Sequence, residues 1–143
     1  MDARARSAAN AGANKVKHRL LAARSRIKGD THALTQILGA TPVAGQPFPD
    51  TSAAIAQLSK HLGTLHADVQ RQGGGGAQGK QARQLTARTI QDTQKSLAKL
   101  AAASKATDQA AAVKLINEGL QLLHEAKLTS HKAGKAMQGT WPI

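Results

Sequence analysis

The chain has 143 residues, of which 41% are hydrophobic, yet Phe48 and Trp141 are its only aromatic residues. This length suits a single domain with one core. Cysteine is absent, which excludes disulfides and thiolate metal sites. Twenty lysines and arginines against eight acids leave a formal charge of +12, which favours polyanionic partners.

The positive charge is concentrated at the two ends of the sequence. Residues 1–28 hold eight basic side chains against one acid, residues 29–79 hold two against three, and residues 80–143 hold ten against four. No continuous apolar run follows the basic N-terminus, so it does not read as a secretory signal. No segment approaches the roughly 18 apolar residues of a membrane span. We expect a soluble, cytoplasmic protein, although secretion without a signal peptide stays compatible with the sequence.

The first expected elements are a disordered basic arm over residues 1–13 and a helix over residues 14–38. Gly29-Asp30-Thr31 is a point where this helix could kink or restart, because Asp and Thr are good N-caps. The apolar positions recur in steps of three and four, as in an amphipathic helix. They are Val16, Leu20, Ala23, Ile27, Leu34 and Ile37.

A second helix is expected after the proline-rich loop 39–50, in which three prolines forbid helix. It begins at residues 50–52, ends near Gln72, and has an unbroken apolar stripe. The stripe consists of Ile55, Leu58, Leu62, Leu65 and Val69.

The segment 72–81, "QGGGGAQGKQ", contains the spacing Gly74, four residues, Gly79-Lys80 of a phosphate-binding loop. Such a loop needs a buried strand before it and Ser or Thr after the lysine. Here an amphipathic helix precedes it and Gln81 follows. We therefore predict a flexible loop over residues 73–79. Lys80 and Arg83 would lie at a helix N-terminus, where an anion is also favoured.

Two further helices are expected over residues 80–103 and 108–138. A break between them is favoured, since Ser104, Thr107 and Asp108 can cap a helix, but one continuous rod stays open. Their apolar seams are Thr86, Ile90, Thr93, Leu97 and Leu100, then Val113, Ile116, Leu120 and Leu123. The sequence thus predicts one all-α domain over residues 14–143, an antiparallel bundle of about four helices with coiled-coil-like packing.

Neither metal nor catalytic chemistry is indicated. The six histidines (18, 32, 61, 66, 124 and 131) include no pair at the i,i+3 or i,i+4 spacing of helical metal ligands. Asp92, Asp108, Glu118 and Glu125 fall mostly outside the seams, where water would keep their pKa values near normal. We expect a non-enzymatic protein without a cofactor.

The basic side chains provide the candidate site. On a helical wheel they flank the apolar stripe of the first helix and line the far face of the third. The predicted anion-binding or nucleic-acid-binding residues are Lys15, Lys17, Arg19, Arg24, Arg26, Lys28, Lys80, Arg83, Arg88, Lys95 and Lys99. A solvated face that only keeps the protein soluble is the competing interpretation. Base stacking is nearly excluded for want of rings, which favours duplex DNA or structured RNA. Membrane binding ranks lower, because the first helix lacks bulky apolar residues.

The alternative is a protein–protein scaffold, either a homo-oligomer or a binder of a helical partner. The fourth helix has a second apolar stripe (Leu115, Leu122, Ala126 and Ala133), and Trp141 could anchor a partner. In size, alanine content and helicity the chain resembles the small helical-hairpin proteins exported by type VII secretion. It departs from them because its tryptophan ends the sequence Gly139-Thr140-Trp141 at the C-terminus, outside any interhelical turn, and because it has no tyrosine.

Overall fold

The computed structural model describes residues 3–39, 52–73 and 76–137, with side chains from Lys15 onward except Val16. Within these ranges the chain is helical and contains no strand. The helices are α1 (Ala3–Gly39), α2 (Ser52–Arg71), α3 (Gly76–Lys105) and α4 (Gln109–Ala136). None of the described helices has the length and apolarity to cross a bilayer.

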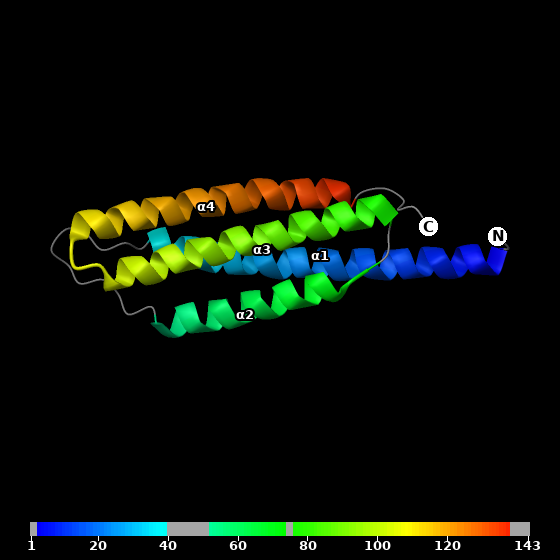
Figure 1. Ribbon diagram of the computed structural model, residues 1–143, viewed down its shortest axis with the longest axis horizontal. Helices are drawn as coiled ribbons and strands as arrows, with labels where there is room; N and C mark the ends of the chain where they lie inside the picture. Colours follow the sequence, from blue (N-terminus) through cyan, green and yellow to red (C-terminus); the bar gives the residue numbers. More distant parts are fainter. Residues whose placement is uncertain (1–2, 40–51, 74–75, 138–143) are drawn as a thin grey trace.

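The four helices pack side by side and run alternately up and down (Figure 1). α1 and α3 contact each other and both of the remaining helices, whereas α2 and α4 do not meet. The start of α1 extends past the ends of the other helices (Figure 1). The prediction of an all-α antiparallel bundle is confirmed.

The core lies between the apolar faces of all four helices and is built from aliphatic side chains. Burial of these side chains supplies the main favourable free energy of folding. The large side chains with almost no exposure include Leu20, Ile27, Leu34, Leu38, Leu62, Ile90, Leu100 and Leu123. Val113, which the sequence placed on the seam of the fourth helix, is instead 41% exposed.

α3 also buries threonines in the middle of its apolar face. Thr86 Oγ1 donates to Ala82 O at 2.7 Å, and Thr93 Oγ1 donates to Thr89 O at 2.8 Å. Each hydroxyl is thus satisfied within its own helix, and only its methyl group needs an apolar neighbour. This is why polar residues can occupy the seam positions that the periodicity assigned to them.

α3 and α4 approach closely where Ser96 faces Gly119. Ser96 Oγ donates to the carbonyl of Gly119 at 2.8 Å. A Cβ on Gly119 would lie 3.4 Å from Leu38 Cδ1 of α1, so three helices come close together at this point.

The beginning of α1 differs from the expected disordered arm. The helix starts at Ala3 and therefore includes residues 3–13, which contain no proline and are rich in alanine and arginine, both strong helix formers. It also continues through Gly29-Asp30-Thr31, the point where the sequence left a kink or restart open. Thr31 Oγ1 donates backwards to Lys28 O at 2.9 Å, so the threonine does not cap a new helix.

The glycine run forms a shorter loop than expected, because α3 starts at Gly76 and already contains Gly79 and Lys80. Gly76 has a φ of 60°, a conformation that favours glycine, so the turn into α3 uses this residue. At the other end of α3 the expected break is confirmed. Asp108 is the N-cap of α4, and its Oδ1 accepts a hydrogen bond from Ala110 N at 3.2 Å.

Candidate anion-binding groove

The predicted cationic residues surround the bundle and do not form one face. Arg24 and Lys28 lie in the groove between α1 and α4, whereas Arg19 and Arg26 lie between α1 and α2. The other predicted residues occupy separate positions. Lys80 and Arg83 line the α2–α3 groove, Arg88 lines the α3–α4 groove, Lys15 and Lys95 are exposed, Lys17 is half-buried, and Lys99 pairs with Glu118.

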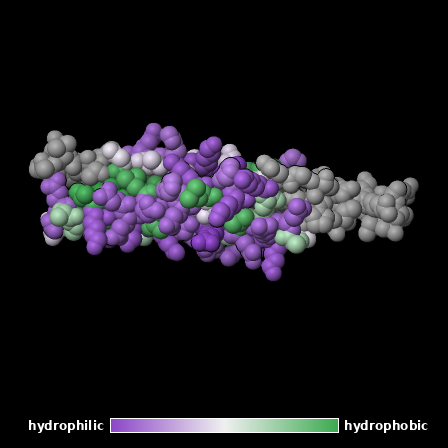
Figure 2. Space-filling model, turned by 90° about the horizontal axis from the view of Figure 1, so that it is seen from above, coloured by the Kyte–Doolittle hydropathy of each residue, from purple (hydrophilic) through white to green (hydrophobic). Residues whose placement is uncertain are grey.

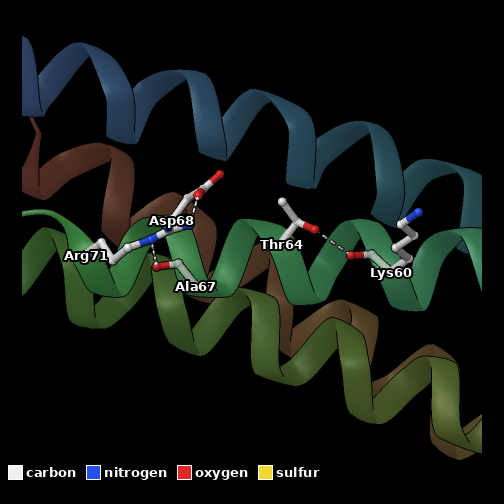
Figure 3. Close-up of polar contacts among 5 residues, drawn as sticks. All are labelled: Lys60, Thr64, Ala67, Asp68 and Arg71. Carbon is white, nitrogen blue, oxygen red and sulfur yellow. Dashed lines mark hydrogen bonds and ion pairs between the residues drawn. The ribbon is translucent and has the colours of Figure 1, made fainter.

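Two of these grooves contain carboxylates that offset their cations. Asp68 lies in the α1–α2 groove and accepts a hydrogen bond from Arg71 Nη2 at 2.6 Å. Figure 3 shows that Arg71 also donates to the carbonyl of Ala67, at 3.4 Å, so its guanidinium is held on the surface of α2. The α3–α4 groove contains Asp92 and Glu125. Neither groove therefore presents only positive charge to an anion.

The α1–α4 groove has a different lining. It has a volume of about 370 Å³ and contains three permanent cations and two histidines, with no carboxylate among its lining residues. α3 contributes Thr89 to it. The lining consists of Arg24, Ile27, Lys28, Thr31, His32, Thr35, Thr89, Ala126, Lys127, Ser130 and His131. The α2–α3 groove also lacks a carboxylate, but its lining has only Lys80 and Arg83 as cations.

Arg24 is fixed in the α1–α4 groove by contacts with α4. Its Nε donates to the carbonyl of Ser130 at 2.9 Å, across 106 residues of sequence. A Cβ on Gly134 would lie 3.0 Å from Arg24 Cζ, so this glycine leaves the space that the guanidinium occupies. A guanidinium has five N–H donors. The bond to Ser130 therefore orients Arg24 while using one of them.

The threonine hydroxyls of the groove are already engaged as donors. Thr35 Oγ1 donates to Thr31 O at 2.7 Å, and Thr89 Oγ1 donates to Leu85 O at 2.9 Å. Thr31 is bonded to its own helix in the same way. The side-chain donors that an anion would meet are therefore those of the arginine, the lysines and the histidines, together with the hydroxyl of Ser130.

Sequence reasoning missed His32, Lys127, Ser130 and His131. A signal was present, because Lys28, Thr31, His32 and Thr35 have the spacing of one helix face, as do Lys127, Ser130 and His131. What joins the two faces is the packing of α1 against α4.

The acids do not all behave as expected, since Asp92 is only 8% exposed. Burial raises the pKa of Asp92, and nearby Glu125 adds to this, whereas Arg88 and Lys95 partly oppose it. Glu118 has a lowered pKa, chiefly because Lys99 Nζ donates to its Oε2 at 2.7 Å. The expectation of near-normal pKa values is wrong for both residues.

Asp30 and His61 join α1 to α2. His61 Nδ1 lies 2.6 Å from Asp30 Oδ2. Burial raises the pKa of Asp30, and the charge and hydrogen bond of His61 partly oppose that rise. Across the described ranges, no three of the histidine, aspartate and glutamate side chains gather as a metal site would require.

Most of the second stripe of α4 is covered within the bundle. Ala126 and Ala133 are buried, Leu115 packs against the core, and Leu122 is half-buried. The face shown in Figure 2 is predominantly hydrophilic, with hydrophobic residues in several patches along its length. Trp141, the other predicted partner contact, lies outside the described residues.

Comparisons of the chain with protein-family models, with curated proteins and with solved structures found no match.

Proposed function

We propose that the protein is a non-enzymatic binding module for polyanions, and that its preferred partner is the phosphate backbone of duplex DNA or structured RNA. The observation that carries this proposal is the α1–α4 groove, which gathers Arg24, Lys28 and Lys127 without a carboxylate in its lining. Lysines and arginines that meet phosphates release condensed counterions, and this release drives binding that depends little on sequence.

The dimensions of the groove suit a short run of neighbouring phosphates. Eleven residues separate Arg24 from Thr35 on α1, which corresponds to about 16 Å along a helix. One strand of duplex DNA advances about 3.4 Å along the duplex axis per phosphate while it winds round that axis, so only about two or three neighbouring phosphates face a groove of this length. Phe48 and Trp141 are the only rings in the chain, so stacking on unpaired bases contributes little and a duplex is favoured.

A salt series with a short DNA duplex tests the proposal. The double variant Lys28→Gln/Lys127→Gln removes two exposed cations of the groove. If both meet phosphates, the slope of log K against log salt becomes shallower by about 1.8. The matched control, Lys60→Gln/Lys105→Gln, makes the same change in net charge at exposed positions of α2 and α3.

The control is expected to change the slope much less than the groove variant. Equal reductions of the salt slope in the two variants would show a diffuse effect of net charge. The groove would then not be the binding site. If the unmodified protein does not bind the duplex even at low salt, the proposal fails outright.

Assembly through the second stripe of α4 has less support, because Ala126 and Ala133 are buried and Leu115 packs against the core.

A further inference from the structure

We propose that the α1–α4 groove is a proton-linked site for a phosphate group, in which His32 and His131 take up protons as the anion binds. The chemistry recognised is a tetrahedral oxyanion. That this oxyanion belongs to a nucleic-acid backbone rests on the proposed function. The proton linkage rests on the groove itself.

The argument starts from the charges around the two histidines. On α1, His32 follows Lys28 by four residues, and on α4, His131 follows Lys127 by four residues, so each shares a helix face with a lysine. Arg24 adds a third permanent cation, and α3 contributes only the uncharged Thr89. Both histidines thus line a space whose permanent charges are all positive.

Histidine changes its charge between about pH 5 and pH 8. A bound oxyanion attracts a protonated imidazole and so favours the charged form of the ring. It also accepts hydrogen bonds from a protonated imidazole, which has two N–H donors. The bound state therefore holds more protons than the empty state.

Linkage fixes the direction of the pH effect. Because binding takes up protons, the affinity must rise as the pH falls. With one proton taken up per histidine, the slope of log K against pH approaches about −2 where both groups titrate. Lysine and arginine stay charged throughout this range and contribute no slope.

The environments of other histidines show what is particular to this pair. His61 lies 2.6 Å from a carboxylate oxygen of Asp30, so it already has an anionic partner. His66 Nε2 lies 3.4 Å from Gln91 Nε2 on α3. His32 and His131 instead share a groove without carboxylates in its lining, where the positive charges favour binding of an external anion.

Isothermal titration calorimetry tests the inference at about pH 5.5 and about pH 8, in two buffers that differ in ionisation enthalpy. The probes are sulfate, which stays fully ionised over this range, and a short DNA duplex. We expect proton uptake with both probes and an affinity more than about tenfold higher at the lower pH.

Two variants locate the effect. His32→Gln/His131→Gln removes both groove imidazoles at exposed positions, and circular dichroism checks that the bundle still forms. His18→Gln/His124→Gln is the matched control, since it changes one exposed histidine on each of the same two helices outside the groove lining. The first variant should lose the proton uptake and keep the high-pH affinity within about twofold, whereas the control should behave like the unmodified protein.

The outcomes separate this inference from the proposed function. Duplex binding without proton uptake, or with equal uptake in both double variants, overturns the inference and leaves the proposed function standing. Proton-linked sulfate binding without duplex binding supports the inference and overturns the proposed function. If neither probe binds at either pH, both proposals are overturned.

Discussion

Asp92 is a carboxylate of α3 that is only 8% exposed, at a point where α3 faces α4. Arg88 and Lys95 lie near enough to oppose the effect of burial on its pKa, but burial dominates and the pKa is raised. The ionised carboxylate is therefore less favourable in the folded protein than in the unfolded chain.

The variant Asp92→Asn should be more stable than the unmodified protein at neutral pH. Because the pKa of Asp92 is higher in the folded protein than the value of 3.8 in the unfolded chain, the protonated carboxyl group favours folding. This contribution to the free energy of unfolding is complete below pH 3.8 and is lost as the pH rises through the pKa of the folded state. The advantage of asparagine should thus appear as the pH increases and vanish in acid. Urea unfolding at several pH values measures this difference.

Glu118→Gln should have the opposite effect on the pH dependence of stability. The pKa of Glu118 is lowered, chiefly by the hydrogen bond from Lys99, so its contribution is present at neutral pH and is lost as the pH falls. Because this pair lies on the surface, the change in the free energy of unfolding should be small.

An Asp92→Asn variant that is less stable than the unmodified protein at neutral pH would mean that Arg88 and Lys95 outweigh burial.

Arg24 illustrates what the sequence could not show at the scale of single residues. The helical wheel placed it on a flank of α1 together with Lys17 and Lys28. The direction of its guanidinium, however, is set by the carbonyl of Ser130 and by the space at Gly134, more than a hundred residues later. Local periodicity holds no information about such a contact. The groove depends on the packing of α1 against α4 and could not be predicted from either helix alone.

At the scale of elements, periodicity and capping predicted the helices well where a boundary residue has a strong capping preference or an apolar stripe is regular. Asp108 caps α4, and the apolar stripe of α2 is buried at Leu62, Leu65 and Val69. The predicted start of α3 is wrong because the glycines were assigned to a loop. Gly79 is buried within α3, where packing offsets its poor helix propensity. Gly29, where a kink or restart was left open, continues α1.

The two faces of α4 should respond very differently to loss of a leucine. Leu123 is 2% exposed and Leu128 is 53% exposed, and both lie within the same uninterrupted helix. Leu123→Ala should lower the free energy of unfolding by about 2–5 kcal/mol, since it removes buried methyl groups and leaves a cavity. Leu128→Ala, at an exposed position, should change it by about 0.5 kcal/mol or less.

Chemical denaturation of the two variants measures both values and needs no assumption about ligands. Equal and small effects would show that Leu123 does not belong to a well-packed core. A large effect of Leu128→Ala would show that an additional surface covers that part of α4 in solution.

At the scale of the whole molecule, the helices contribute unequally to the bundle. α3 and α4 share the most extensive interface, whereas α2 lies at the edge, in contact with α1 and α3 and away from α4. The first half of α2, residues 52–60, contains no buried residue, and its buried side chains begin at Leu62. Periodicity does not reveal this difference, because the apolar stripe of α2 is as regular as any in the chain.

This inequality predicts the order in which the helices open. Among α2, α3 and α4, the amide hydrogens of α2 should exchange first, beginning with residues 52–60, and those of α3 and α4 should exchange last, because local opening costs least where the fewest apolar side chains are buried. Hydrogen exchange followed by mass spectrometry gives the order directly. Leu62→Ala should speed exchange throughout α2 while the amides of α3 and α4 keep most of their protection. If Leu62→Ala instead speeds exchange in all four helices equally, α2 belongs to the same cooperative unit as the α3–α4 pair, and the bundle opens only as a whole.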